Sequence, residues 1–330
     1  MEPRARIYVA GQDTLIGSAL IRELKRQGFV SLLGEPGEEP ALTDAAAVDA
    51  WFDRMLPEYV VVAAGKSGGI HLNMREPAEL MRNNLLVTCH VLESAYRHGV
   101  NKLLYLGSSC TYPQHCPQPM KIESMLTGPL EPTNEAYAVA KIAGITLCQA
   151  YRQQYGAPFI SGIPGDPFGP GDDFNPERSH VIAALIRRMH EAKRRGDASV
   201  TVWGSGNPRR GFTFVDDLAN ACVFVMQAYD ELEPINIGGV WDLSIRDIAE
   251  LVKEAVGYEG ALQFDASQPD GMPVKVLDSS RLTAMGWQPQ QSVRAALAAT
   301  YQWFLGHQRS DQAWSYVAET PSGTARANRR

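Results

Sequence analysis

Four side chains that could carry out hydride and proton transfer lie close together in the middle of the chain. Ser108 and Cys110 follow the apolar run 103–106, which predicts a short buried strand. Tyr137 and Lys141 come four residues apart after a helix-start signal, so a helix would carry both on one face. Because an open parallel sheet binds ligands at the carboxyl ends of its strands, we expect these side chains to share one site.

Ser108, Tyr137 and Lys141 together suit hydride transfer at a carbonyl or alcohol carbon. A tyrosine hydroxyl has a pKa of about 10, and a nearby ammonium favours the phenolate and lowers that pKa. The serine can meanwhile hold the carbonyl oxygen by a hydrogen bond. Chance alone could place a tyrosine four residues before a lysine in a chain with 12 tyrosines. The Gly-Ser-Ser-Cys turn at the predicted strand end favours the catalytic interpretation.

A glycine-containing turn follows the first predicted strand, 6–10. The sequence GQDTLIG leads directly into a helix, where a dinucleotide site has its phosphate-binding turn. The middle glycine of that motif is a threonine here, and its Cβ would leave less room for a pyrophosphate. A plain strand-to-helix turn is the alternative. The predicted cofactor contacts in this turn are Gly11, Thr14, Leu15, Ile16 and Gly17.

An acidic stretch, GEPGEE, follows the second predicted strand, 30–33. An acidic residue at this place suits a ribose 2′-hydroxyl and repels a 2′-phosphate. No arginine or lysine lies between Arg26 and Arg54. If the nicotinamide cofactor NAD(P)H binds here, we therefore predict that Glu35 contacts it and that NADH is favoured over NADPH. The alternative is an acidic loop that only faces solvent.

Composition argues against several classes of protein. The chain has 330 residues and a net charge of −6, which gives no electrostatic basis for binding nucleic acid. No run of about 18 apolar residues is present, so we expect no membrane span, and the start shows no signal-peptide pattern. The five cysteines have no metal-binding spacing, which predicts free thiols, no metal and a cytoplasmic location.

Alternating strands and helices predict an α/β fold built on a Rossmann-like doubly wound parallel sheet, with a smaller C-terminal α/β substrate domain. The polar tail from 308 to 330 is expected to be disordered. The predicted limits are 1–165 plus about 212–242 for the dinucleotide-binding domain, and about 166–211 with 243–307 for the substrate-binding domain.

Two arginine pairs, 187–188 and 209–210, lie in the second part of this acidic chain. Guanidinium groups suit phosphates because their donors match phosphate oxygens in pairs. The pair at 187–188 fits a solvated helix face equally well. The pair at 209–210 follows a Gly/Pro turn, which favours a functional interpretation.

Longer segments resemble the GDP-L-fucose synthase family of the extended short-chain dehydrogenase/reductases. The resemblance runs from about residue 6 to 307 and implies a 3,5-epimerase/4-reductase acting on a GDP-4-keto-6-deoxy sugar. The segments that carry it include GSSCTYP (107–113), LTGPLEPTNEAYAVAKIAGI (126–145), FGPGDDFNPERSHVIAALIRR (168–188) and VWGSGNPRRGF (202–212).

The resemblance implies a role for each candidate residue. Ser108, Tyr137 and Lys141 match the reductase triad, and Cys110 and His180 match the pair that exchanges protons at C3 and C5. A C4 ketone acidifies both of those C–H bonds, so a thiolate and an imidazole on opposite faces could invert them. Further cofactor contacts are implied at Ala63, Ala64, Gly65, Lys141, Pro164, Asp166 and His180. Substrate contacts are implied at Ser109, Arg187, Trp203, Arg210 and Lys275.

Four places depart from the family pattern: Thr14, the acidic stretch 34–39, the segment 166–168 and Phe214. Three of them lie near expected cofactor positions, so three functions stay open. The first is an epimerase/reductase with an altered cofactor preference. The second is an enzyme that only epimerises or only reduces, or that acts on a related GDP-sugar such as a heptose. The third is a non-catalytic nucleotide-sugar-binding protein. The family also implies a homodimer packed through helices 79–98 and 135–154.

Overall fold

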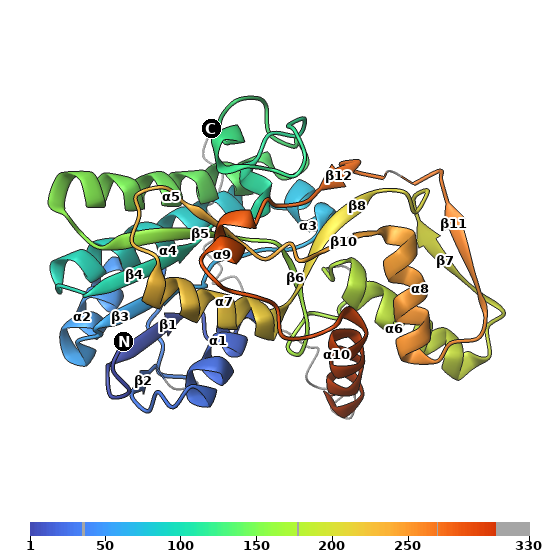
Figure 1. Ribbon diagram of the computed structural model, residues 1–330, viewed down its shortest axis with the longest axis horizontal. Helices are drawn as coiled ribbons and strands as arrows, with labels where there is room; N and C mark the ends of the chain where they lie inside the picture. The colour runs from blue at the N-terminus through green and yellow to red at the C-terminus, as the bar shows by residue number, and fades with distance from the viewer. Residues whose placement is uncertain (35–36, 177, 269, 308–330) are drawn as a thin grey trace, which may run out of the picture.

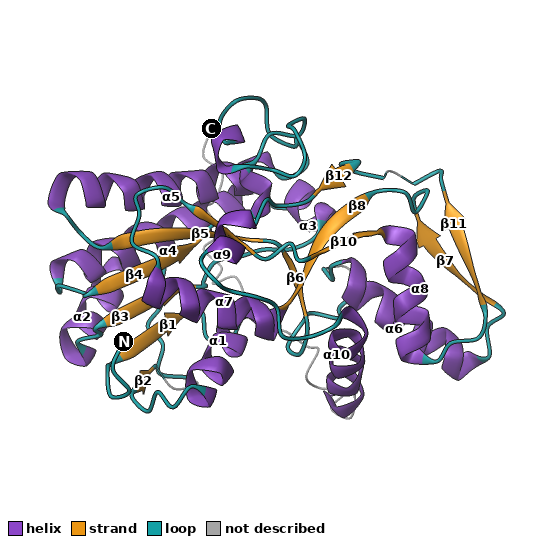
Figure 2. Cartoon of the chain, viewed as in Figure 1, coloured by secondary structure: helices purple, strands orange, loops and turns teal. Residues whose placement is uncertain are grey.

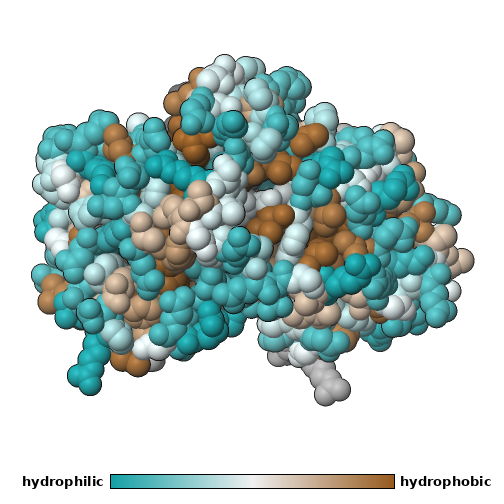
Figure 3. All heavy atoms as spheres, in the orientation of Figure 1, coloured by the Kyte–Doolittle hydropathy of each residue, from teal (hydrophilic) through white to brown (hydrophobic). Residues whose placement is uncertain are grey.

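The computed structural model describes residues 1–34, 37–176, 178–268 and 270–307. A large sheet with helices on both faces lies beside a smaller group of strands and helices (Figure 1). The secondary-structure colouring shows the large sheet as one layer between two helical layers (Figure 2). The surface facing the viewer is hollowed between the two parts, and apolar residues line some of that hollow (Figure 3).

Six parallel strands form the large sheet, in the order β2-β1-β3-β4-β5-β9. The later strands extend from one side of β1 and β2 lies on the other, so the sheet has its switch point at β1. This confirms the predicted doubly wound parallel fold, whose ligands bind outside the carboxyl ends at that point. The strands are β1 Ile7–Ala10, β2 Leu32–Leu33, β3 Tyr59–Val62, β4 Lys102–Leu106, β5 Phe159–Pro164 and β9 Ile235–Ile237.

Successive residues of β1 pack into two different cores, which explains why the whole strand is apolar. Ile7 and Val9 pack with α1 and α7 on one face of the sheet. Tyr8 and Ala10 pack with α2 and α4 on the other face, where α5 also lies. Side chains alternate across a strand, so a strand covered on both faces needs apolar residues at every position. These helices are α1 Leu15–Arg26, α2 Ala45–Met55, α4 Pro77–Arg97, α5 Glu135–Tyr155 and α7 Val215–Ala228.

The smaller group is organised around strand β8, which pairs with β6, β10 and β12. A separate parallel pair, β7 with β11, lies beyond it. Three helices, α6, α8 and α10, share a third core with these strands. The elements are β6 Asp166–Phe168, α6 Val181–Arg195, β7 Ser199–Trp203, β8 Arg209–Phe214, β10 Trp241–Ser244, α8 Ile245–Val256, β11 Ala261–Asp265, β12 Val274–Lys275 and α10 Val293–His307.

Short elements complete the described chain. They are α3 Ile70–Arg75, α9 Ser280–Ala284, and the 3-10 turns η1 Ser109–Thr111 and η2 Ile122–Ser124. None of the helices described is long and apolar enough to cross a membrane. The division into two domains stays a prediction, and residues 308–330 lie outside the described part of the chain.

Two predicted elements differ from the structure. The sequence predicts a sheet element over 212–217, but β8 ends at Phe214 and α7 begins at Val215. Asp216 and Asp217 in the first turn of α7 suit the positive end of a helix dipole, which favours helix there. The extended segment predicted over 272–278 contains only the two-residue strand β12, because only those residues pair with β8.

Candidate active site

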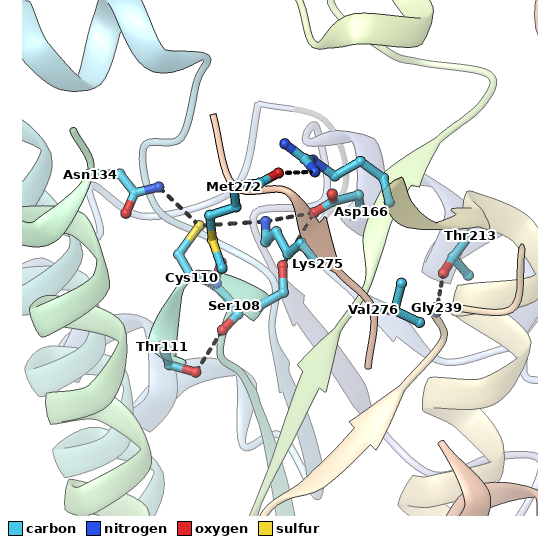
Figure 4. A network of polar contacts seen from close by, with 12 residues as sticks. Ser108, Cys110, Thr111, Asn134, Asp166, Thr213, Gly239, Met272, Lys275 and Val276 are labelled. Atoms are coloured by element: carbon cyan, nitrogen blue, oxygen red, sulfur yellow. Dashed lines mark hydrogen bonds and ion pairs between the residues drawn. The ribbon is translucent and has the colours of Figure 1, made fainter. Parts of the chain in front are cut away.

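The carboxyl end of β4 carries the first two candidate catalytic residues. Ser108 caps the turn η1, and its Oγ accepts a hydrogen bond from the Cys110 amide at 3.2 Å. The Thr111 hydroxyl donates to the Ser108 carbonyl at 2.7 Å, which fixes the turn further. Ser108 and Cys110 are both half-buried, and the same turn carries them into the polar network around Lys275 (Figure 4).

Helix α5 brings Tyr137 and Lys141 to the same turn. The Tyr137 and Ser108 side chains are hydrogen-bonded to each other. Lys141 is buried, donates to the Leu106 carbonyl at 3.1 Å, and has its Nζ 5.9 Å from the centre of the Tyr137 ring. The predicted strand end and helix face therefore meet, and they gather the three side chains that hydride transfer at a carbonyl requires.

Burial controls how these groups titrate. It lowers the pKa of Lys141 to about 8. Burial also raises the pKa of Tyr137 above its ordinary value, while the Ser108 hydrogen bond and the Lys275 charge act in the lowering direction. The sequence predicts that Lys141 lowers this pKa, whereas the cation that does so here is Lys275. A phenol with a raised pKa stays protonated at neutral pH and can serve as an acid.

The Cys110 sulfur has polar neighbours from two distant segments. The side-chain amide of Asn134 donates to it at 3.4 Å, and Lys275 Nζ lies 3.8 Å away (Figure 4). Sequence reasoning missed Asn134, although it lies in the predicted helix-start signal. It occupies the N-cap position of α5 without making a side-chain cap hydrogen bond. Nothing in the sequence distinguishes this asparagine from an ordinary N-cap residue, because the missing cap bond is visible only in the structure.

Asp166 and Ser109, predicted to contact the cofactor and the substrate, are linked to each other and to Lys275. Asp166 forms an ion pair with Lys275 at 2.9 Å and accepts a hydrogen bond from the Ser109 hydroxyl at 3.2 Å. Ser109 is itself buried. The Lys275 charge is the largest influence that lowers the pKa of Asp166, although burial opposes it. In this structure both residues support Lys275 beside the thiol.

His180 is the N-cap of α6 and is exposed to solvent. Partial desolvation by the surrounding protein lowers the pKa of His180, and the Asp166 charge opposes that change. The ring also interacts with the Lys275 charge, which acts to lower the pKa. His180 is thus brought to the same charge cluster as Cys110.

The predicted substrate residues are divided between the cluster and the cleft beyond it. Arg210 donates to the Met272 carbonyl at 2.7 Å, and its charge acts on Asp166 and Cys110. Arg187 pairs with Glu191, and its buried Nε has no hydrogen-bond partner within the described residues. Trp203 is 56% exposed and its ring meets the His71 ring edge-on at 5.8 Å.

The turn between β1 and α1 has the shape that a pyrophosphate needs. Gly11 has a φ of +80°, and a Cβ there would lie 2.6 Å from Ala64 Cα. A Cβ on Gly17 would lie 1.9 Å from the Gly11 carbonyl oxygen. The turn therefore packs tightly against the end of β3, where Ala63 and Ala64 were predicted. Gly65 follows in the same segment, and Pro164 is buried at the end of β5.

Thr14 fits this turn because its side chain points back into the protein. Its hydroxyl donates to the Gly11 carbonyl at 2.8 Å and accepts from the Gly17 amide at 3.0 Å, so it caps α1. Its φ of −75° suits any residue. The first amides of α1, those of Leu15 and Ile16, have no intrahelical acceptor and stay available for an anion. The residues present therefore fit a dinucleotide.

An acidic side chain also reaches this turn. The Glu39 carboxylate accepts hydrogen bonds from the Gly11 amide at 2.7 Å and the Tyr8 hydroxyl at 2.9 Å. Burial raises the pKa of Glu39, the Gly11 hydrogen bond lowers it, and the nearby charge of Asp13 raises it. Glu35, the residue predicted from the sequence, lies outside the described residues. Sequence reasoning found the acidic stretch but not Glu39 within it, nor Asp13.

Residues 7–238 match the NAD dependent epimerase/dehydratase family. The chain belongs to this family. GDP-L-fucose synthase 1 of Arabidopsis thaliana is 52% identical over 91% of this chain and 93% of the relative. GDP-L-fucose synthase of Escherichia coli K12 is 44% identical over 92% of this chain and 98% of the relative. The predicted resemblance to the GDP-L-fucose synthase family and the prediction of an NAD(P)-dependent enzyme are both confirmed.

Solved structures agree with this assignment. A GDP-L-fucose synthetase from Naegleria fowleri, bound to NADP, superposes with a TM-score of 0.87 at 28% identity, over 94% of this chain and 95% of that one. A GDP-6-OMe-4-keto-L-xylo-heptose reductase from C. jejuni gives a TM-score of 0.87 at 30% identity, over 93% and 99% of the two chains. The family fold is thus shared across enzymes named for hexose and heptose substrates.

Proposed function

We propose that the chain is a 3,5-epimerase/4-reductase of a GDP-4-keto-6-deoxy sugar. One observation carries the proposal: the Cys110 thiol lies in the same charge cluster as the hydrogen-bonded Ser108–Tyr137 pair. A reductase alone needs the hydroxyl pair but has no use for a thiol beside it. A thiol at this place can exchange protons at carbons next to the carbonyl that the hydroxyls hold.

Proton exchange needs an acid and a base on opposite faces of the sugar. The Cys110 thiolate removes the proton from C3 or C5, and the electron pair of that C–H bond moves onto the C4 oxygen as an enolate. Ser108 and Tyr137 hold that oxygen by hydrogen bonds. His180, as an imidazolium, delivers a proton to the carbon from the other face, and exchange with water restores both side chains.

Reduction uses the same hydroxyl pair. A bound NAD(P)H would supply the hydride, and the turn at Gly11 and the first amides of α1 would hold its pyrophosphate. Ser108 positions the C4 carbonyl oxygen, and Tyr137 gives that oxygen a proton as the carbon is reduced. The raised pKa of Tyr137 keeps that proton in place at neutral pH.

The nucleotide end of the substrate has three candidate contacts. Arg210 reaches the cluster itself and suits the phosphate nearer the sugar. Arg187 offers a buried guanidinium nitrogen that lacks a partner among the residues described. The exposed ring of Trp203 offers a stacking surface for the base. These features support a GDP-sugar substrate.

Turnover tests the proposal against its alternatives. Purified protein is given NADH or NADPH with GDP-4-keto-6-deoxy-D-mannose or the matching GDP-4-keto-heptose, and loss of the reduced dinucleotide is followed. Faster turnover of the hexose, with products inverted at C3 and C5, supports the proposal. Faster turnover of the heptose, or product that keeps its configuration, favours the second function. No turnover of either sugar favours a binding protein.

The pH dependence of the reduction reports Lys141. Its pKa of about 8 means that the cation is lost as the pH rises through that value. We expect kcat/KM for the dinucleotide, which reports the free enzyme, to fall above about pH 8. In Lys141→Arg the guanidinium stays charged, so the alkaline fall should move to higher pH even if the maximal rate is lower. A fall at the same pH in both proteins would contradict this.

We further propose that NADH is preferred over NADPH. The Glu39 carboxylate accepts a hydrogen bond from Gly11 in the β1–α1 turn, and the charge of a second carboxylate, Asp13, acts on it. Two carboxylates would repel a 2′-phosphate. The described residues of the turn and of the following loop contain no lysine or arginine to pair with such a phosphate.

Replacing Asp13 by arginine should shift this preference. The new guanidinium would remove one repulsive charge and pair with the 2′-phosphate, so NADPH should bind about tenfold tighter, equivalent to about 1.4 kcal/mol. NADH affinity should change little. Calorimetric titration of both dinucleotides measures the shift. Asp53→Arg, on the exposed face of α2, makes the same charge change away from the turn and should leave both affinities alone.

A homodimer in the cytoplasm completes the proposal. Helices α4 and α5 carry partly exposed aromatic rings, with Tyr96 37% and Tyr155 50% exposed and stacked at 4.6 Å. Val139 on α5 is also 37% exposed. These apolar groups support packing of two copies through these helices, which sedimentation would test. The five free cysteines are consistent with a reducing compartment.

A further inference from the structure

The cation beside Cys110 comes from a part of the chain with no sequence link to the catalytic turn. Lys275 Nζ lies 3.8 Å from the Cys110 sulfur, across 165 residues of sequence. Its side chain is only 15% exposed, so solvent screens its charge weakly. At this distance an ammonium favours a thiolate over a neutral thiol.

The fold holds Lys275 in this place by two means. Its strand, β12, pairs with β8, where Lys275 lies opposite Arg210. Strand β6 pairs with β8 as well, and there Asp166 lies opposite Phe212, two residues further along. The Asp166 carboxylate then binds Lys275 Nζ at 2.9 Å, so the ammonium is fixed by a partner that is itself bound to Ser109.

Two cations on neighbouring strands act on the sulfur itself: Lys275 on β12 and Arg210 on β8. Each of them also has a carboxylate near it, because Asp166 pairs with Lys275 and the Asp270 charge acts on Arg210. Tyr137 also acts on Cys110, and burial raises the pKa of this phenol, so it stays neutral at neutral pH.

Asn134 adds an observation of the same kind. Its side-chain amide donates to the sulfur at 3.4 Å instead of capping its own helix. A thiolate accepts such a hydrogen bond more strongly than a neutral thiol does. Both neighbours of the sulfur are therefore donors or cations, and both favour the deprotonated form.

We propose that Lys275 is a positioning residue that holds the Cys110 sulfur as a thiolate, ready to act as the base for proton exchange. The proposal rests on the function proposed above, in which Cys110 removes a proton from the sugar. The family resemblance implies that Lys275 contacts the substrate. The proposal gives Lys275 a role at the Cys110 thiol that does not depend on that contact.

Alkylation of Cys110 by iodoacetamide tests this without any substrate, because the reagent reacts with the thiolate. The rate is measured from pH 5 to pH 10, and mass spectrometry separates Cys110 from the other four cysteines. In Lys275→Met and Lys275→Gln we expect the midpoint of the rate profile to rise by about one pH unit. Lys275→Arg keeps the positive charge, so its midpoint should lie close to that of the wild type. Lys121→Met, which removes an exposed lysine, is the matched control and should follow the wild type.

An unchanged midpoint in both neutral variants would overturn the proposal, as would an equal rise in Lys275→Arg. Two neutral variants are used because one of them could fold poorly. Thermal melting of each variant shows whether it is folded. The result is also separable from the proposed function. The midpoint could depend on Lys275 in a protein that exchanges no sugar protons. That result would support the role of Lys275 at the thiolate and reject the proposed epimerase activity.

Discussion

Replacing Cys110 by serine is expected to abolish proton exchange at C3 and C5 while leaving the reductase groups in place. A serine hydroxyl has a much higher pKa than a thiol, so the neighbouring Lys275 cannot make it a useful base. The loss of one general base typically costs about 10²- to 10⁴-fold, and we expect exchange to fall within that range. Deuterium uptake into the sugar in heavy water measures it.

The outcome for reduction separates the two activities. Ser108 still accepts the amide hydrogen bond of residue 110, which comes from the backbone, so the hydroxyl pair should keep its geometry. The Cys110→Ser variant should therefore still reduce a 4-keto sugar, now without inversion. Cys116→Ser is the matched control, because Cys116 is half-buried and lies in the following loop. Exchange lost equally in both variants would mean that Cys110 has no special role.

Replacing Tyr137 by phenylalanine should have the largest effect on reduction. The variant loses the acid that protonates the C4 oxygen and the partner of the Ser108 hydroxyl. We expect the rate of reduction to fall about 10³-fold, within the usual range for a lost general acid. Dinucleotide affinity should stay unchanged, because the β1–α1 turn does not involve this residue.

Proton exchange should suffer less in Tyr137→Phe, since Ser108 still holds the enolate oxygen. Stopped-flow loss of the reduced dinucleotide measures reduction, and deuterium uptake measures exchange in the same preparation. Tyr155→Phe, a change in an exposed ring of α5, should alter neither rate. Reduction at the wild-type rate in Tyr137→Phe would remove Tyr137 from the mechanism.

The sequence predicts the large sheet and the main catalytic group because both follow from local patterns. Continuous apolar runs separated by helices specify a parallel sheet, and the end of one such run places Ser108 and Cys110 at its ligand-binding edge. A spacing of four places Tyr137 and Lys141 on one helix face. The structure adds only that this face meets that edge.

The surroundings of Cys110 depend on contacts that no local pattern encodes. Lys275 reaches the sulfur because β6 and β12 both pair with β8, a register that the short strands do not reveal in sequence. The predicted roles of Asp166 and Ser109 toward ligands could not anticipate their hydrogen bond to each other. The sequence also could not show that burial, rather than Lys141, dominates the titration of Tyr137.

The contacts of the β1–α1 turn also could not be predicted from the local sequence pattern. Thr14 is expected to reduce the room for a pyrophosphate, yet its hydroxyl turns inward and caps α1. The acidic stretch is recognisable by composition, but which of its carboxylates reaches Gly11 depends on the path of the loop. The structure gives that contact to Glu39.

The most direct test of the account is deuterium exchange without any dinucleotide. The protein is incubated in heavy water with GDP-4-keto-6-deoxy-D-mannose, and the sugar is examined by mass spectrometry and proton NMR. We predict deuterium at both C3 and C5, at rates that Cys110→Ser abolishes and Cys116→Ser leaves unchanged. A sugar that keeps both protons, in a protein that still reduces it when NADH or NADPH is added, would contradict the central claim that Cys110 and the hydroxyl pair form one epimerase/reductase site.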